Sequence, residues 1–314
     1  MPQITTSQFE EKITSIISAS GATTMSVAIK HLESGEEHYF DADRVVPMCS
    51  VFKIPVLCET VRQIHAGYLG FDDRWTLTMG EKNLPSGILV YFQDGLMPTV
   101  RDLLTVMINI SDNTATDMIM HRLDANVGKY ATTRFIHRLG LTDIHVPMTV
   151  RDLFNDIMGE EGSDPRLLHK ILGQFYVEPP SNRQGKAYSL GEENDVATPR
   201  ALNRLLEMIW NGEVVSRQAS DEILYILLQQ TLNQRLPRFL PDNTPFAHKT
   251  GTLGGIRNDS GILYCNDKSH VAISVLSTWD VNNAPSDPIE HDQLLVGIDM
   301  AMGKIGLATF EQFR

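Results

Sequence analysis

Ser50 and Lys53 are three positions apart and could act together as a nucleophile and its base. They stand at the start of a helical pattern, where residues at this spacing share one face and come within reach of each other. The positive end of the helix dipole lies near Ser50. A lysine that is desolvated or close to another cation can lose its proton and serve as the base for a serine. The pair therefore predicts serine activation without histidine, although a single Ser-x-x-Lys motif is common by chance.

A second polar group, Ser111-Asp112-Asn113, separates two apolar helical segments. Serine, aspartate and asparagine are preferred at helix N-caps, so a simple cap is one interpretation. The alternative is a loop that presents a hydroxyl and an amide to a cleft. The motif by itself leaves both interpretations open.

A third group, Lys249-Thr250-Gly251-Thr252, lies on a predicted strand that runs into a glycine-rich turn. One interpretation is an edge strand with a solvated lysine. The other is a strand whose backbone lines a substrate. Gly251 would then allow close approach, the two threonines would supply hydrogen bonds, and Lys249 would supply positive charge.

Hydrophobic periodicity predicts the elements that position these motifs. Thr198 is expected to cap a helix that begins at Pro199 and ends before Gly212. Strands near both ends of the chain and a helical middle indicate a sheet built from distant segments, terminal helices that cover it, and a second, helical lobe. A cleft between the lobes is the natural place for a site. Other helices are expected at about 9–17, 51–65, 99–110, 125–139 and 289–305, and strands at about 23–32, 37–40, 246–253, 261–265 and 271–279.

The composition is that of a folded globular protein and excludes several classes. The chain has 314 residues, and 27 Lys+Arg against 39 Asp+Glu give a formal net charge of −12. The acid excess argues against a nucleic-acid partner, and no apolar run approaches the ~20 residues that span a membrane. The N-terminal residues lack the basic start and apolar stretch of a signal peptide. Three cysteines are too few for a disulfide scaffold and fit a reducing compartment.

The three motifs together are far more specific than any one of them. Ser-x-x-Lys, Ser-Asp-Asn and Lys-Thr-Gly each occur once, in this order and in the expected context of helix start, interhelical loop and strand. This set is the signature of class A β-lactamases and penicillin-binding proteins. The chain resembles that superfamily over nearly its whole length, and within it class A most closely.

The resemblance implies an α+β fold of the β-lactamase/transpeptidase type, with an antiparallel sheet flanked by helices and a mainly helical lobe. Residues 1–45 and 196–314 would form a discontinuous α/β subdomain, and residues 46–195 a helical subdomain. An extra segment at about 160–195 departs from the family pattern and would border the cleft. Long loops in such places are functional lids or mobile decoration, and both interpretations stay open.

Four residues take catalytic roles if the resemblance holds. Ser50 would attack a carbonyl, and Lys53 would be its general base. Ser111 would relay a proton to the leaving group, helped by the positive field of Lys249. This division into base, nucleophile and relay also follows from general catalytic logic.

The remaining site residues would bind the substrate. Asn113 would bind a substrate amide, Thr250 and Thr252 a carboxylate, and Gly251 would let the substrate approach the strand. The backbone N–H groups of Ser50 and Thr252 would form the oxyanion hole, in which each donor contributes about 3 kcal/mol. No cofactor and no metal is expected.

The sequence departs from class A where deacylation is carried out. Class A enzymes activate the deacylating water with a glutamate in a Glu-x-x-Leu-Asn pattern. An ungapped count places Val150 at that glutamate, Leu153 at the leucine and Phe154 at the asparagine. A valine cannot activate water. The nearest alternative carboxylates are Asp152, for which an ion-paired or capping role is at least as plausible, and then Asp156, Glu160 and Glu161.

Three functions therefore compete. We favour slow hydrolysis of a β-lactam or a related amide or ester through an acyl-enzyme. The alternatives are an esterase or acyl transferase of the same fold, and a penicillin-binding protein that acylates without efficient turnover. We expect a monomer that acts on a small molecule, with no nucleic-acid or membrane partner. We also expect a cytoplasmic protein, or a periplasmic or secreted one if a leader has been removed from a sequence that here begins at Met1.

Overall fold

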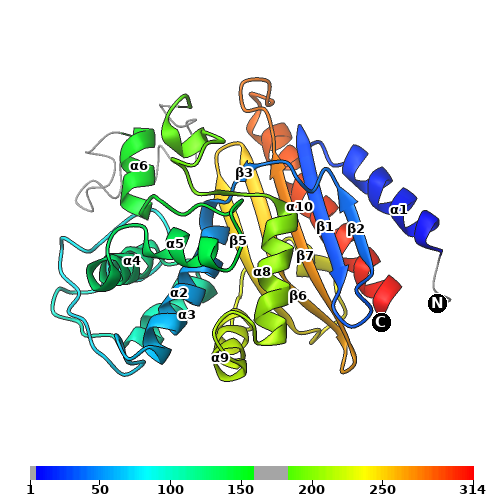
Figure 1. Ribbon diagram of the computed structural model, residues 1–314. Helices are drawn as coiled ribbons and strands as arrows, with labels where there is room; N and C mark the ends of the chain where they lie inside the picture. The colour runs from blue at the N-terminus through cyan, green and yellow to red at the C-terminus, as the bar shows by residue number, and fades with distance from the viewer. Residues whose placement is uncertain (1–4, 159–182) are drawn as a thin grey trace.

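A five-stranded antiparallel sheet forms the centre of the computed structural model, which describes residues 5–158 and 183–314 (Figure 1). The strand order is β2-β1-β7-β6-β5, so the first two strands of the chain pair with the last three, and β5 lies at an edge. The strands are β1 (Thr24–His31), β2 (Glu37–Phe40), β5 (Phe246–Leu253), β6 (Ile256–Asn266) and β7 (Ser269–Thr278). A small second sheet pairs β3 (Val46–Pro47) with β4 (Val196–Ala197).

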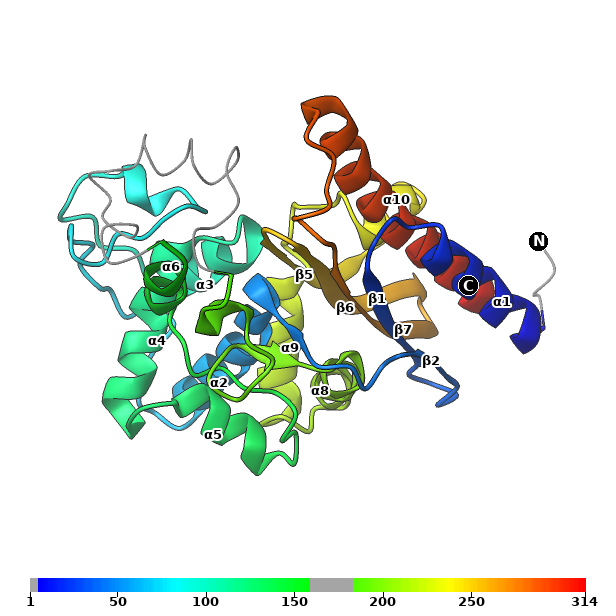
Figure 2. The same cartoon turned by 90° about the horizontal axis from the view of Figure 1, so that it is seen from above.

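Helices cover both faces of the large sheet. In Figure 2, α1 (Thr6–Ser18) and α10 (Pro288–Phe313) lie on one side, and α8 (Pro199–Asn211) and the helical lobe lie on the other. The apolar residues form two large clusters, one under α1 and α10 and one that joins the opposite face of the sheet to the lobe. The other helices are α2 (Lys53–His65), α3 (Val100–Asn109), α4 (Asn113–Val127), α5 (Ala131–Arg138), α6 (Val150–Met158) and α9 (Arg217–Leu227), with 3-10 turns η1 (Cys49–Phe52), η2 (Leu89–Tyr91), η5 (Lys186–Tyr188) and η6 (Leu236–Phe239).

Capping residues set the helix boundaries largely as the sequence predicts. The Thr198 side chain accepts a hydrogen bond from the backbone N–H of Ala201, Pro199 takes the first turn of α8, and Gly212 ends the helix in a left-handed conformation. The α+β class and the meeting of distant strands in one sheet are confirmed. Two elements are longer than predicted, because β6 begins at Ile256 and α10 continues to Phe313.

One predicted helix is wrong. The span 125–139 is split between α4 and α5. The chain leaves the helical conformation at Gly128 and Tyr130, whose φ angles are 91° and 60°. The Asp124 carboxylate then accepts hydrogen bonds from the backbone N–H groups of Tyr130 and Ala131, at 3.3 and 3.0 Å. This side chain satisfies N–H groups at the start of α5, so a break at this point is stable.

Helix α10 is long and apolar enough, by length and composition, to cross a membrane, and it alone passes this test among the described residues. This differs from the expectation that no apolar run approaches the ~20 residues that span a membrane. Most of its apolar side chains pack under the sheet, where Ile298, Met302 and Ile305 are fully buried. This is the environment of a core helix in a folded domain.

The sheet is held tightly against the segment that precedes Ser50. The Asn258 side-chain amide on β6 donates to the carbonyl groups of Pro47 and Met48, at 2.9 and 3.0 Å. On β5, a Cβ atom at Gly251 would lie only 2.4 Å from the Met48 carbonyl oxygen. The third motif therefore needs glycine here for packing within the protein.

Gly251→Ala should destabilise the protein by about 1–3 kcal/mol, the usual cost of overpacking, because the added methyl group meets rigid backbone. The measurement is the free energy of unfolding in denaturant. Gly297→Ala in α10 is the matched control, since the nearest atom to its new Cβ lies at 3.8 Å. The control should be neutral or stabilising by about 0.5–1 kcal/mol. Equal stability of the two variants would contradict the packing argument.

Candidate active site

The predicted nucleophile, Ser50, lies in the 3-10 turn η1, directly before α2. Lys53 is the first residue of α2, and its backbone N–H donates to the carbonyl of Ser50. Cys49, which directly precedes Ser50, has a φ angle of 49°. A left-handed conformation is costly for a residue other than glycine, and such strain is concentrated at functional sites. The turn places Ser50 at a partly exposed position while Lys53 points into the protein.

The Lys53 amine is fully buried and is surrounded by neutral acceptors. Its Nζ atom donates to the Ser111 carbonyl at 2.7 Å, to Ser111 Oγ at 3.0 Å and to Asn113 Oδ1 at 2.9 Å. Burial lowers the pKa of Lys53 to about 7, although the carboxylates of Asp112 and Asp117 act in the opposite direction. The structure thus joins the first two predicted motifs through one amine.

The Ser111-Asp112-Asn113 loop serves both of the roles that the sequence left open. Asp112 is the N-cap of α4 and accepts from the backbone N–H of Ala115 at 2.8 Å. It also accepts from the N–H groups of Ile88 and Leu89, at 2.6 and 2.9 Å. These bonds fix the loop, and Ser111 turns its hydroxyl toward Lys53 with a φ angle of 60°.

Lys249 is fully buried on β5, so the interpretation as a solvated lysine is wrong. Its Nζ atom donates to the Thr250 carbonyl at 2.8 Å. Burial, and then the charge of Lys53, hold the pKa of Lys249 well below its ordinary value, whereas Asp259 acts in the opposite direction. Its hydrogen bond goes to the strand backbone, and the lowered pKa favours the neutral form of the amine.

Arg235 belongs to the same region and was missed by the sequence reasoning. Its guanidinium donates to the carbonyl groups of Gly251 and Asn258, both at 2.7 Å, and to Thr252 Oγ1 at 2.6 Å. Its Nε atom donates to Asp299 on α10 at 3.1 Å. No local motif surrounds this arginine, so only the folded structure reveals a fixed positive charge beside Thr252.

A cavity of about 340 Å³ lies between β5, the Ser111 loop and α6. Three residues of the predicted site do not line this cavity, namely Lys53, Lys249 and Gly251. The lining includes Ser50, Ser111, Asn113, Thr250 and Thr252 from the predicted site, apolar Val150, Leu153, Phe154 and Ile157 from α6, and Asn194 and Asp195.

Neither carboxylate of α6, Asp152 or Asp156, lines this cavity. Val150 is buried at the start of the helix. Asp152 shares two side-chain–backbone hydrogen bonds with Thr149, which is a capping role. Asp156 accepts from the backbone N–H of Ala187 at 2.9 Å. The other two predicted candidates, Glu160 and Glu161, lie outside the described residues, as does most of the extra segment.

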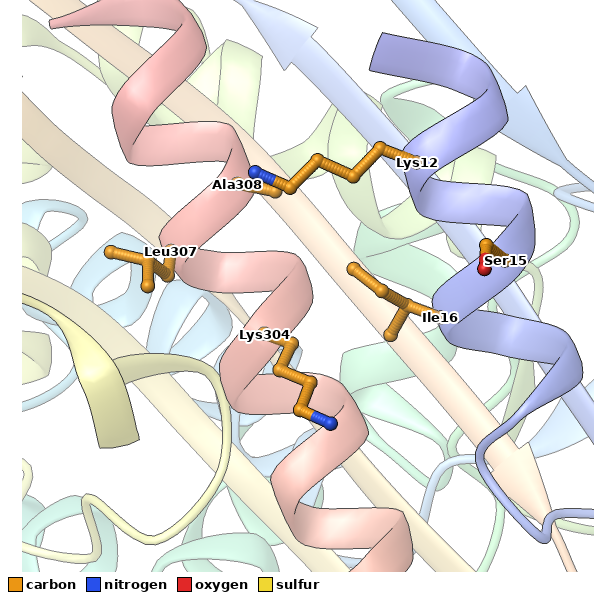
Figure 3. A pocket seen from close by; sticks show the side chains of 6 residues that line it. All are labelled: Lys12, Ser15, Ile16, Lys304, Leu307 and Ala308. Atoms are coloured by element: carbon orange, nitrogen blue, oxygen red, sulfur yellow. The ribbon is translucent and has the colours of Figure 1, made fainter. Parts of the chain in front are cut away.

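A second hollow, of about 290 Å³, lies between α1 and α10 (Figure 3). It contains two lysine amines, and that of Lys12 is paired with Glu311 at 3.0 Å. Its wall holds one hydroxyl and no group that could act as a base toward it. Within the described ranges, no three His, Cys, Asp or Glu side chains are grouped as metal ligands. The hollow between α1 and α10 is lined by Lys12, Ser15, Ile16, Lys304, Leu307 and Ala308.

Among curated proteins, this chain is similar in sequence to several β-lactamases and to a β-lactamase regulatory protein. The β-lactamase VEB-1 of Pseudomonas aeruginosa is 26% identical over 276 residues, which cover 84% of this chain and 80% of that protein. The β-lactamase regulatory protein BlaB of Streptomyces cacaoi is 24% identical over 281 residues, or 83% of this chain and 86% of that protein.

Solved structures agree on the fold. A β-lactamase from Sphaerobacter thermophilus superposes with a TM-score of 0.73 at 23% identity and covers 95% of both chains. The structure of PBP-A superposes with a TM-score of 0.72 at 21% identity and covers 98% of both chains. The model of the β-lactamase enzyme family matches residues 8–291, which is most of the sequence. The chain therefore belongs to the β-lactamase enzyme family.

Proposed function

We propose that the protein hydrolyses β-lactams through an acyl-enzyme formed on Ser50. The observation that supports this most directly is the buried amine of Lys53, which bonds to Ser111 and Asn113 beside the cavity that Ser50 lines. Because its pKa is about 7, a large fraction of this amine is neutral at physiological pH. A neutral amine at this place is suited to the base that the serine requires.

Acylation then needs three proton movements. Lys53 takes the proton of the Ser50 hydroxyl as Oγ attacks the lactam carbonyl. The oxyanion is stabilised by the backbone N–H groups of Ser50 and Thr252. Lys53 passes its proton through Ser111 to the lactam nitrogen, and the amide bond breaks. The short contact between Lys53 Nζ and Ser111 Oγ, 3.0 Å, supports this relay.

The substrate's carboxylate would lie against the end of β5. Thr252 is exposed there, and its hydroxyl is held by Arg235. Thr250 lines the same wall, and the buried guanidinium of Arg235 supplies a fixed positive charge beside Thr252. Asn113, which already accepts from Lys53, would offer its amide group to the acylamide of the substrate.

The finer assignments are also proposals. The site lies within one chain, so we propose a monomer that acts on a small molecule and has no membrane partner. We keep the cytoplasm as its location, with the periplasm or the exterior as the alternative. We also propose the division into an α/β subdomain (1–45 and 196–314) and a helical subdomain (46–195).

Ser50→Ala should abolish turnover of a chromogenic cephalosporin and remove the covalent adduct in intact-mass spectra. Ser34→Ala, in the turn between β1 and β2, is the control and should retain both. Steady turnover by the native chain supports the β-lactamase. A persistent adduct would instead indicate a penicillin-binding protein, and hydrolysis of a small acyl ester alone would indicate an esterase. Unchanged activity of Ser50→Ala would contradict serine acylation.

The acylation rate should rise with pH and level off above about 7, because the pKa of Lys53 is lowered to about 7 and only its neutral form is a base. The measurement is the pre-steady-state rate of adduct formation at a series of pH values. Lys53→Arg, which keeps the charge, should lose at least about 100-fold in this rate, since arginine stays protonated. An acylation rate independent of pH across this range would show that another group is the base.

Thr252→Val should raise KM about 10-fold or more for a lactam that carries a carboxylate, because a hydrogen bond to a charged group contributes about 1.5–3 kcal/mol. The same variant should have a nearly unchanged KM for a neutral acyl ester, and this substrate is the internal control. Equal losses for the two substrates would mean that Thr252 does not bind the carboxylate.

A further inference from the structure

Asp195 lines the cavity, and only one oxygen of its buried carboxylate is hydrogen-bonded. The residue directly precedes β4, and its backbone carbonyl accepts from the N–H of Met48, two residues before Ser50, at 2.8 Å. Its Oδ1 atom accepts from the backbone N–H of Met148 at 3.1 Å. Its Oδ2 atom is buried and has no hydrogen-bond partner in the structure. Asp195 as a whole is 1% exposed.

An unpartnered carboxylate oxygen beside a reactive cavity needs an explanation, since buried polar atoms are almost always hydrogen-bonded. Asp195 lines the same cavity as Ser50 and Ser111. Oδ2 is closed to solvent in this structure, so water, the smallest donor, would reach it from the cavity after a small shift of the surrounding side chains. A carboxylate that holds a water near an acylated serine has the chemistry that deacylation requires.

The surroundings make Asp195 a stronger base than an ordinary aspartate. Burial, and then the carboxylates of Asp117 and Asp152, hold the pKa of Asp195 well above its usual value, and only the Met148 N–H acts in the opposite direction. Burial also raises the pKa of the Cys49 thiol, and the charge of Asp195 acts in the same direction. A base whose pKa approaches the working pH is more effective in proton transfer.

Other carboxylates near α6 are already engaged. Asp117 caps α6 by accepting from the N–H groups of Val150 and Arg151, at 2.7 and 2.9 Å. Asp117 also accepts from the side-chain amide of Asn83 at 2.6 Å. Asp152 caps the same helix from outside. Asp195 is therefore the carboxylate of the described residues that both lines the cavity and has an oxygen without a hydrogen-bond partner.

We propose that Asp195 is the general base of deacylation and does the work for which Val150 carries no suitable group. The inference rests on the acyl-enzyme proposed above. Asp195 Oδ2 takes a proton from water as the water oxygen attacks the ester carbonyl of acylated Ser50. The bond between that carbon and Ser50 Oγ then breaks. The proton passes from Asp195 to the departing oxygen, which leaves a free serine and a carboxylic acid product.

The test is the Asp195→Asn variant, followed by intact-mass spectrometry after mixing with a cephalosporin. The asparagine oxygen can still accept from Met148, so folding and acylation should stay within about 3-fold of the native protein, whereas deacylation should slow about 100-fold or more. The adduct should then accumulate. Asp267→Asn is the matched control, because it makes the same change of charge at an exposed position in the turn between β6 and β7, and it should deacylate normally.

A pH profile separates this role from a structural one. Deacylation by the native protein should rise with pH through the raised pKa of Asp195, and Asp195→Asn should lose this dependence while the pH profile of acylation persists. Normal deacylation by Asp195→Asn would overturn the inference, and so would an equal fall of acylation, deacylation and thermal stability. If the variant does not fold, pH-independent deacylation of the native protein from about pH 4 to 9 overturns it. Failure of the native chain to form any adduct would instead overturn the proposed function.

Discussion

The burial of the Lys53 amine is the constraint on which the rest of the site depends. A buried ammonium without a partner is very costly, and the acceptors around this one are a carbonyl, a hydroxyl and an amide oxygen. Neutral acceptors bond to the amine but stabilise its charged form less than a carboxylate would. Burial therefore lowers the pKa of Lys53 to about 7. The loop that carries these acceptors has to stay in one place. Three hydrogen bonds to the Asp112 carboxylate hold this loop in place. Within the loop, Ser111 adopts a left-handed backbone conformation.

The same logic divides the cavity into two walls of different character. The wall formed by β5 is backed by the buried guanidinium of Arg235, which Asp299 on α10 holds in place. The wall formed by α6 is apolar. A substrate with an anionic end and an acyl centre would lie with its charge on the first wall. The second wall would exclude water from all but the polar floor at Asp195.

Much of this could be predicted from sequence, because the three motifs are local and their helix and strand contexts are strong. Lys53 is hydrogen-bonded to Ser111 and Asn113, and Ser50 lines the same cavity as these two residues. Arg235 could not be found this way, since its partners come from β5, β6 and α10. The burial of Lys249 was also beyond a local pattern. An edge strand is solvated by default, and this one is covered by η1.

The apolar α6 and the buried aspartate are two parts of one arrangement. A glutamate at position 150 would bring a carboxylate into the cavity, but it would also hydrate the α6 wall. Val150, Leu153 and Phe154 keep that wall dry, and a dry wall strengthens the desolvation that raises the pKa of Asp195. Asp195 is in turn fixed in place by the pairing of β3 with β4 and by the Met148 N–H. An apolar α6 and a basic Asp195 are therefore compatible features of the same cavity.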